Sequence, residues 1–114
     1  MRILNLFRKR PSPSPGLYVP VTIADIIKGK PSKPIIKHTH VEIKGRVVEV
    51  LHEQDGDHHV WVSDGINKIA CEIIPELPLR LPNSGSNILI DGILRYDYEH
   101  SWFEVHPICR WKGI

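Results

Sequence analysis

Apolar and polar residues alternate along the last two thirds of the chain, as expected for β-strands that are buried on one face. Turn residues separate five such segments at intervals of roughly ten positions. The segments are HVEIKGRVVEVLHEQ, HHVWVS, NKIACEII, NILIDGILRY and WFEVHPICRW. The pattern therefore predicts an all-β domain over residues 38–114.

The residues between these segments predict how the strands are joined. Asp55-Gly56 and Asp64-Gly65 favour hairpins, so the first three strands are expected to form a meander. A two-residue turn at Asp64-Gly65 places Trp61 opposite Lys68. The prolines in PELPLRLPNSG exclude a regular strand and predict an irregular crossing to the fourth strand. The first strand contains Gly45, which permits a bend that lets this strand pair in both halves of a barrel.

The residues before the strands predict a short helix and a tail. In VTIADIIKGKPSKP, Thr22 is a suitable N-cap and Gly29 a terminator for a helix from about Ile23 to Lys28. The apolar side of this helix is expected to cover one end of the barrel. The composition of RKRPSPSPG favours a disordered basic tail. We therefore divide the chain into a tail (1–16), a helix with its linker (17–37) and a β-barrel (38–114).

A meander of three strands, a longer connection and a final hairpin form the strand order expected of an OB barrel. The opening KGRVVEV, with its central glycine, resembles the first strand of OB-fold domains, and the resemblance covers roughly the last two thirds of the chain. It implies a five-stranded Greek-key barrel that closes in the spatial order 1, 2, 3, 5, 4. Strands two, three and five are then neighbours.

The chain also resembles a group of small, functionally uncharacterised OB-like proteins in three short motifs. These are a Gly-Asp-x-His strand start, a Glu-Ile-x-Pro strand end, and a late His followed by Glu-x-His-Pro. The matching residues here are Gly56, Asp57 and His59; Glu72, Ile73 and Pro75; and His100, Glu104, His106 and Pro107. This resemblance assigns no activity.

Period-two alternation places polar residues of strands two, three and five together on the outer face of the barrel. Carboxylates and imidazoles gather there, a combination that suits zinc, manganese or iron. The candidate metal ligands are Asp57, His59, Glu72, His100, Glu104 and His106. With open coordination positions, such a site could activate water on a phosphate or an ester. The alternative is that these residues are surface pairs that hold the cross-strand register.

The same outer face carries residues expected to bind single-stranded nucleic acid, because it is the usual ligand surface of the OB fold. Its tryptophans can stack on bases, and nearby cations can contact phosphates. The candidate residues are Lys44, Arg46, Trp61, Lys68, Arg95 and Trp102. The alternative is that the tryptophans only pack across the barrel surface.

Charge is divided unevenly along the chain. Residues 1–37 hold eight basic residues and one acidic residue, whereas residues 38–114 hold seven basic and twelve acidic residues. An acidic barrel repels phosphate unless its cations gather on one face. No apolar run reaches the roughly 18 residues of a membrane span, and the N-terminus lacks the features of a signal peptide. We therefore expect a cytoplasmic protein without membrane contact.

Together these patterns favour a non-catalytic OB-type module that binds single-stranded nucleic acid or another polyanion. The first alternative is a metal-binding protein, in one version a metal-dependent hydrolase, with a divalent ion such as zinc as its cofactor. The second is a protein-interaction module that uses the Pro-rich tail.

Overall fold

In the computed structural model, which describes residues 17–114, the long strand β2 (His40–His52) pairs with two other strands of the barrel. Its first half pairs with β5 (Asn87–Asp97) and its second half with β3 (His58–Ser63). Gly45 lies where the two halves meet, and a Cβ atom there would come within 2.7 Å of the Ser63 carbonyl oxygen. The strand takes part in both halves of the barrel as predicted, the close approach of β3 leaves no room for a side chain at Gly45, and the register irregularity lies between Val47 and Glu49.

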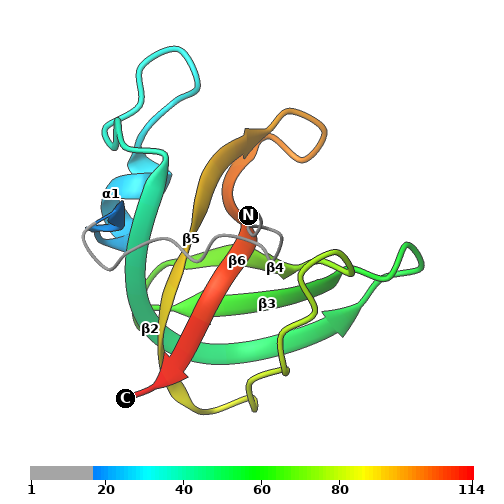
Figure 1. The fold of residues 1–114 in the computed structure, drawn as a ribbon. Helices are drawn as coiled ribbons and strands as arrows, with labels where there is room; N and C mark the ends of the chain where they lie inside the picture. The colour runs from blue at the N-terminus through cyan, green and yellow to red at the C-terminus, as the bar shows by residue number, and fades with distance from the viewer. Residues whose placement is uncertain (1–16) are drawn as a thin grey trace, which may run out of the picture.

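The strands close into a five-stranded barrel of the OB type (Figure 1). The remaining two barrel strands are β4 (Lys68–Ile73) and β6 (Trp102–Gly113). The strand order is β2-β3-β4-β6-β5, and β5 pairs back onto β2. Strands β4 and β6 are parallel, and the other barrel neighbours are antiparallel. This confirms the fold class and the spatial order predicted from the sequence, while the predicted tail (1–16) lies outside the described residues.

Two short elements precede the barrel. Helix α1 (Ile23–Lys28) begins where the sequence predicts, and the Thr22 side chain accepts a hydrogen bond of 3.0 Å from the backbone N–H of Asp25. Ile23 and Ile26 are buried in the core, so the helix covers part of the barrel interior as expected. Strand β1 (Val19–Pro20) pairs in parallel with β2, an addition that the hydrophobic pattern did not predict.

The core consists of β-branched and other apolar side chains from all five barrel strands. The buried strand residues are Val41, Ile43, Val47, Val60, Val62, Ile69, Cys71, Ile73, Ile88, Ile90, Val105 and Ile108. Their alternation sorts β3, β4 and β6 into inner and outer faces as predicted. The polar residues between them therefore lie on the outside of three adjacent strands.

The hairpin between β3 and β4 has a longer loop than the sequence suggested. Trp61 pairs with Ala70 rather than with Lys68, so the predicted two-residue turn is wrong. The Asp64 carboxylate accepts hydrogen bonds of 2.9 and 2.7 Å from two backbone N–H groups of the loop, and these bonds close a four-residue connection. Because the register moves by two residues, each side chain keeps its predicted face.

The connection between β4 and β5, residues 74–86, contains neither helix nor strand, as its prolines predicted. Leu79 and Leu81 of this segment pack against the core. Within residues 17–114, α1 is the only helix, and it is far too short to cross a membrane.

Candidate functional site

Three aromatic side chains, Trp61, Trp102 and His100, form what we call the aromatic row on the outer face of the barrel. The rings of Trp61 and Trp102 meet edge to face, with 5.2 Å between their centroids. His100, in the loop between β5 and β6, stacks on Trp102 with 4.7 Å between centroids and 9° between planes. Both indoles are half-buried on the surface and do not belong to the core. The row therefore offers aromatic surface of the kind on which bases stack.

Ala70 explains why the two tryptophans can meet. It lies on β4 with Trp61 as its partner on β3 and Glu104 as its partner on β6. Its methyl group points outward, yet it is 1% exposed. A small residue on the central strand leaves room for large side chains from both neighbouring strands to approach each other above it.

Cations flank the aromatic row. The Lys68 Nζ atom lies 4.9 Å from the ring centroid of Trp61, within cation–π range. Arg46 pairs with Ser63, and Ser63 pairs with Lys68, so the two cations lie in one row across the sheet. Both side chains are exposed. They are available for phosphate contacts beside Trp61.

Lys44 lies away from the aromatic row. It points out of the β2–β5 side of the barrel, where it lines a pocket with Thr22 and Leu89. The sequence grouped it with the other cations because alternation gives only the inner or outer face. Outward residues can lie on different sides of a closed barrel, and alternation does not tell which side. Lys44 and Trp61 both point outward but lie on different sides.

Glu104 is fully buried beneath the aromatic row. Its Oε1 accepts a hydrogen bond of 3.0 Å from the indole N–H of Trp102, and its Oε2 accepts one of 2.9 Å from Nε of Arg95. The Arg95 guanidinium is half-exposed and balances the buried charge. Glu104 thus orients Trp102, and the structure does not place it among the groups that could share a metal ion.

His100 has a partner of its own as well. Its Nδ1 lies 2.7 Å from Oδ2 of Asp97, and this hydrogen bond raises the pKa of His100 and lowers that of Asp97. The result favours an imidazolium ring stacked on Trp102. Of the six candidate metal ligands, His100 and Glu104 therefore lie outside the group described next.

The other four candidate ligands converge, and we call Asp57, His59, Glu72 and His106 the Glu72 cluster. Glu72 lies on β4 between His59 of β3 and His106 of β6. Its Oε1 is 3.5 Å from Nε2 of His59 and 3.3 Å from Nε2 of His106. The same His106 nitrogen is 3.7 Å from Oδ2 of Asp57. The two-residue change in hairpin register is what brings His59 opposite Glu72.

The Glu72 carboxyl group is 5% exposed and has two other carboxylates nearby. Burial, followed by hydrogen bonding and repulsion from Glu104 and Asp57, raises the pKa of Glu72 to about 9. Without a bound cation this group therefore holds a proton at neutral pH. A buried carboxyl group in this state is unusual outside binding and catalytic sites.

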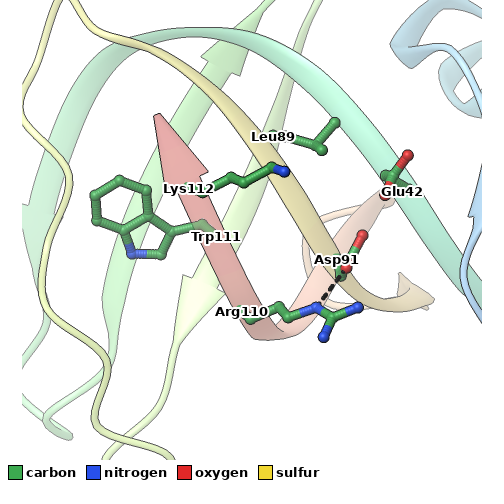
Figure 2. Close-up of a pocket in the computed structure, with 6 residues that line it drawn as sticks. All are labelled: Glu42, Leu89, Asp91, Arg110, Trp111 and Lys112. Carbon is green, nitrogen blue, oxygen red and sulfur yellow. Dashed lines mark hydrogen bonds and ion pairs between the residues drawn. The ribbon is translucent and has the colours of Figure 1, made fainter. Parts of the chain in front are cut away.

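A separate pocket lies on the outside of β2, β5 and β6, with a volume of about 350 Å³. Figure 2 shows Arg110 hydrogen-bonded to Asp91 at 2.7 Å, with Glu42 close to the same carboxylate. Burial and the neighbouring Asp91 raise the pKa of Glu42. Leu89, Trp111 and Lys112 complete the lining. Sequence reasoning missed this pocket, although alternation on neighbouring strands was the signal that could have revealed it.

Comparisons with known proteins identify the fold. No protein-family model and no curated protein sequence matches the chain. Among solved structures, a chain of the Stn1–Ten1 complex of S. pombe superposes with a TM-score of 0.70 and 14% identity, over 85% of this chain and 78% of that one. Asparaginyl-tRNA synthetase from Pyrococcus horikoshii gives a TM-score of 0.64 and 16% identity over 82% of this chain, which spans only 22% of the synthetase. The hypothetical protein ygiW from E. coli gives 0.56 and 17%, over 91% and 94% of the two chains.

Proposed function

We propose that this OB-fold module binds single-stranded nucleic acid across β3, β4 and β6, with bases stacked on the aromatic row. The observation that supports this most directly is the contact of Trp61 and Trp102 on the outer face, with Lys68 beside one ring and His100 on the other. Each base stacked on an aromatic side chain contributes about 1–3 kcal/mol. A face of this kind is the usual ligand surface of the fold.

The barrel has more acidic than basic residues, but cations near the aromatic row favour binding of nucleic acid there. Two carboxylates beside the row, Glu104 and Asp97, are each hydrogen-bonded to a cationic partner, whereas Glu49, the β2 partner of Trp61, is exposed. Lys68 is exposed beside Trp61, and Arg46 is exposed in the same row across the sheet. Cations that phosphates can reach therefore lie beside the row.

Similar structures give this proposal a limited context. One of them belongs to an asparaginyl-tRNA synthetase, an enzyme whose name gives an RNA as its substrate. At 16% identity the similarity concerns the fold, and fold alone does not fix function. The proposal therefore depends on the residues of the outer face.

A fluorescence titration tests the proposal. The chain has three tryptophans, so Trp111→Phe leaves Trp61 and Trp102 as the only indoles and as the reporters of binding. We expect single-stranded DNA or RNA of roughly a dozen nucleotides to quench their emission at low salt, as stacking requires. We expect Trp61→Ala to weaken binding by about tenfold, and added salt to weaken it further.

Trp111 supplies the matched control, because it lies against Arg80 on another side of the barrel. Trp111→Phe should bind as tightly as the wild type in an assay that does not use fluorescence, such as a gel shift. If neither single-stranded DNA nor RNA binds at low salt, the proposal is wrong. Equal losses in Trp61→Ala and Trp111→Phe, or equal affinity for duplex DNA, would also contradict it.

A further inference from the structure

The Glu72 cluster is assembled by the strand order of the barrel. Glu72 is on the central strand β4, and the two strands beside it each place a histidine next to its carboxylate. Asp57, in the loop just before β3, approaches from the end of the sheet. The β3–β4 hairpin and the distant strand β6 thus direct imidazole and carboxylate groups toward one point. Imidazole and carboxylate are the ligands that zinc and similar divalent ions accept.

The distances in the cluster differ from those of the hydrogen-bonded ion pairs elsewhere in the molecule. The Arg95–Glu104 and Arg110–Asp91 pairs have distances of 2.9 and 2.7 Å. In the cluster the distances between imidazole nitrogens and carboxylate oxygens are 3.3, 3.5 and 3.7 Å. Ligand atoms bound at about 2.0–2.2 Å to a tetrahedral zinc ion lie roughly 3.3–3.6 Å apart. The spacing is therefore closer to that of a coordination sphere than to that of hydrogen bonds.

Three of the four residues in the cluster place their ligand atoms close to one another. Ligand atoms of Asp57, Glu72 and His106 all lie within 4.8 Å of one another. Glu72 is buried, while the side chains of His106 and Asp57 are 20% and 18% exposed. An ion can therefore reach the group from solvent and still gain a buried carboxylate ligand. Within the cluster, His59 contacts only Glu72. It is placed to act as a fourth ligand or to orient Glu72.

Two other groups in the described residues contain metal-binding side chains: Asp97, Glu99 and His100, whose ligand atoms also lie within 4.8 Å of one another, and the pair His52 and His58. His100 and Asp97 are joined by a hydrogen bond of 2.7 Å, and backbone N–H groups of the same turn also bind Asp97. His52 and His58 have Nδ1 atoms 2.6 Å apart, which is a hydrogen-bond distance. In both groups the histidine ring already has a hydrogen-bond partner within the group.

We propose that Asp57, Glu72 and His106, assisted by His59, bind one zinc ion or a similar divalent transition-metal ion on the outer face of the barrel. The ion supplies positive charge beside the Asp57 and Glu72 carboxyl groups, which have no Lys or Arg ion-pair partner in the described residues. Its site lies on β3, β4 and β6, the same strands that carry the aromatic row. The proposal does not depend on nucleic-acid binding.

Calorimetric titration of the full chain with zinc chloride, after removal of bound metal by a chelator, tests the site. We expect one zinc ion per chain. Asp57→Asn and His106→Ala should each weaken zinc binding by at least tenfold, because the first replaces an anionic ligand with a neutral amide and the second removes a ligand. His52→Ala is the matched control, since it removes an exposed histidine with an imidazole partner outside the cluster, and it should bind zinc as the wild type does.

Side-chain nitrogen spectra of the histidines provide a second readout. Zinc should shift the Nε2 signal of His106 and leave that of His52 unchanged. If His106→Ala fails to fold, as judged by circular dichroism, the half-buried Asp57→Asn variant decides the result. Absence of zinc binding by the wild type would overturn the proposal, as would loss of binding in His52→Ala with retention in Asp57→Asn.

Discussion

Glu72 and Glu104 are both buried carboxyl groups on the outer side of the sheet, but their partners differ. Glu104 accepts hydrogen bonds from Trp102 and Arg95 at 3.0 and 2.9 Å. Glu72 faces two imidazoles at longer distances and has Asp57 nearby. Burial of a charge is costly unless a partner compensates it. Glu104 is thus compensated within the protein, whereas Glu72 can gain from an added cation.

Arg95 and Glu104 allow a test of this difference at the residue scale. We expect Arg95→Ala to lower the free energy of unfolding by about 2–3 kcal/mol, because it leaves the Glu104 carboxylate buried without its cation. We expect Glu104→Gln to cost only about 1 kcal/mol, because an amide oxygen can still accept the Trp102 hydrogen bond. Urea unfolding of the three proteins gives both values. Equal costs for the two substitutions would contradict the assignment.

At the scale of elements, strand β5 changes its register with β6 around Gly92. The glycine is buried, and a Cβ atom there would contact the Val105 side chain and lie 2.8 Å from the carbonyl oxygen of Pro107. The two strands can approach only because the side chain is missing. This contact fixes β6, and with it the positions of Trp102 and His106.

Gly92→Ala should therefore be strongly destabilising, by about 3 kcal/mol, since the backbone of β6 would have to move. Gly113→Ala is the control in the same pair of strands, because nothing lies within 4 Å of a Cβ atom at that position. We expect it to change stability by less than about 0.5 kcal/mol. Thermal and urea unfolding measure both effects. A Gly92→Ala protein as stable as the wild type would show that β5 and β6 adjust without cost.

For the whole molecule, the charge of His100 links pH to the proposed nucleic-acid binding. Its hydrogen bond to Asp97 raises its pKa above the usual 6.5, so the ring is cationic below that raised value and neutral above it. Affinity for single-stranded nucleic acid should consequently fall as the pH rises from about 6 to 8. Asp97→Asn should move this fall to lower pH. A pH-independent affinity in the Trp111→Phe titration would contradict the prediction.

The two proposed sites lie on the same three strands, which gives a further prediction for the whole molecule. A zinc ion in the Glu72 cluster would offset negative charge beside Trp61 and Trp102, and a cation near the row attracts phosphate. We expect saturating zinc to strengthen binding of single-stranded nucleic acid by about threefold to tenfold at low salt. The wild type should show this gain, and Asp57→Asn should not. An equal gain in both proteins would indicate non-specific metal bridging.

Much of the fold was predictable because it depends on local patterns. Period-two alternation identified the five barrel strands and the outward position of Trp61, Glu72 and His106. The turn residues and the Pro-rich crossing gave the order of the connections, and few closed barrels are compatible with that order. Thr22 and the apolar residues after it identified α1. In each case neighbouring residues in the sequence carry the signal.

What the sequence alone determined is therefore the fold class, the strand order and the side of the sheet on which each residue lies. Only the tertiary structure decided which outward residues meet. The hairpin register depends on hydrogen bonds within the loop at Asp64, and the direction around the barrel separates Lys44 from Trp61. The pairing of Glu104 with Arg95, and of Glu72 with His59 and His106, depends on differences of a few tenths of an ångström in the distances between side chains of neighbouring strands. Such distances are set by the closure of the whole barrel, so no local pattern contains them.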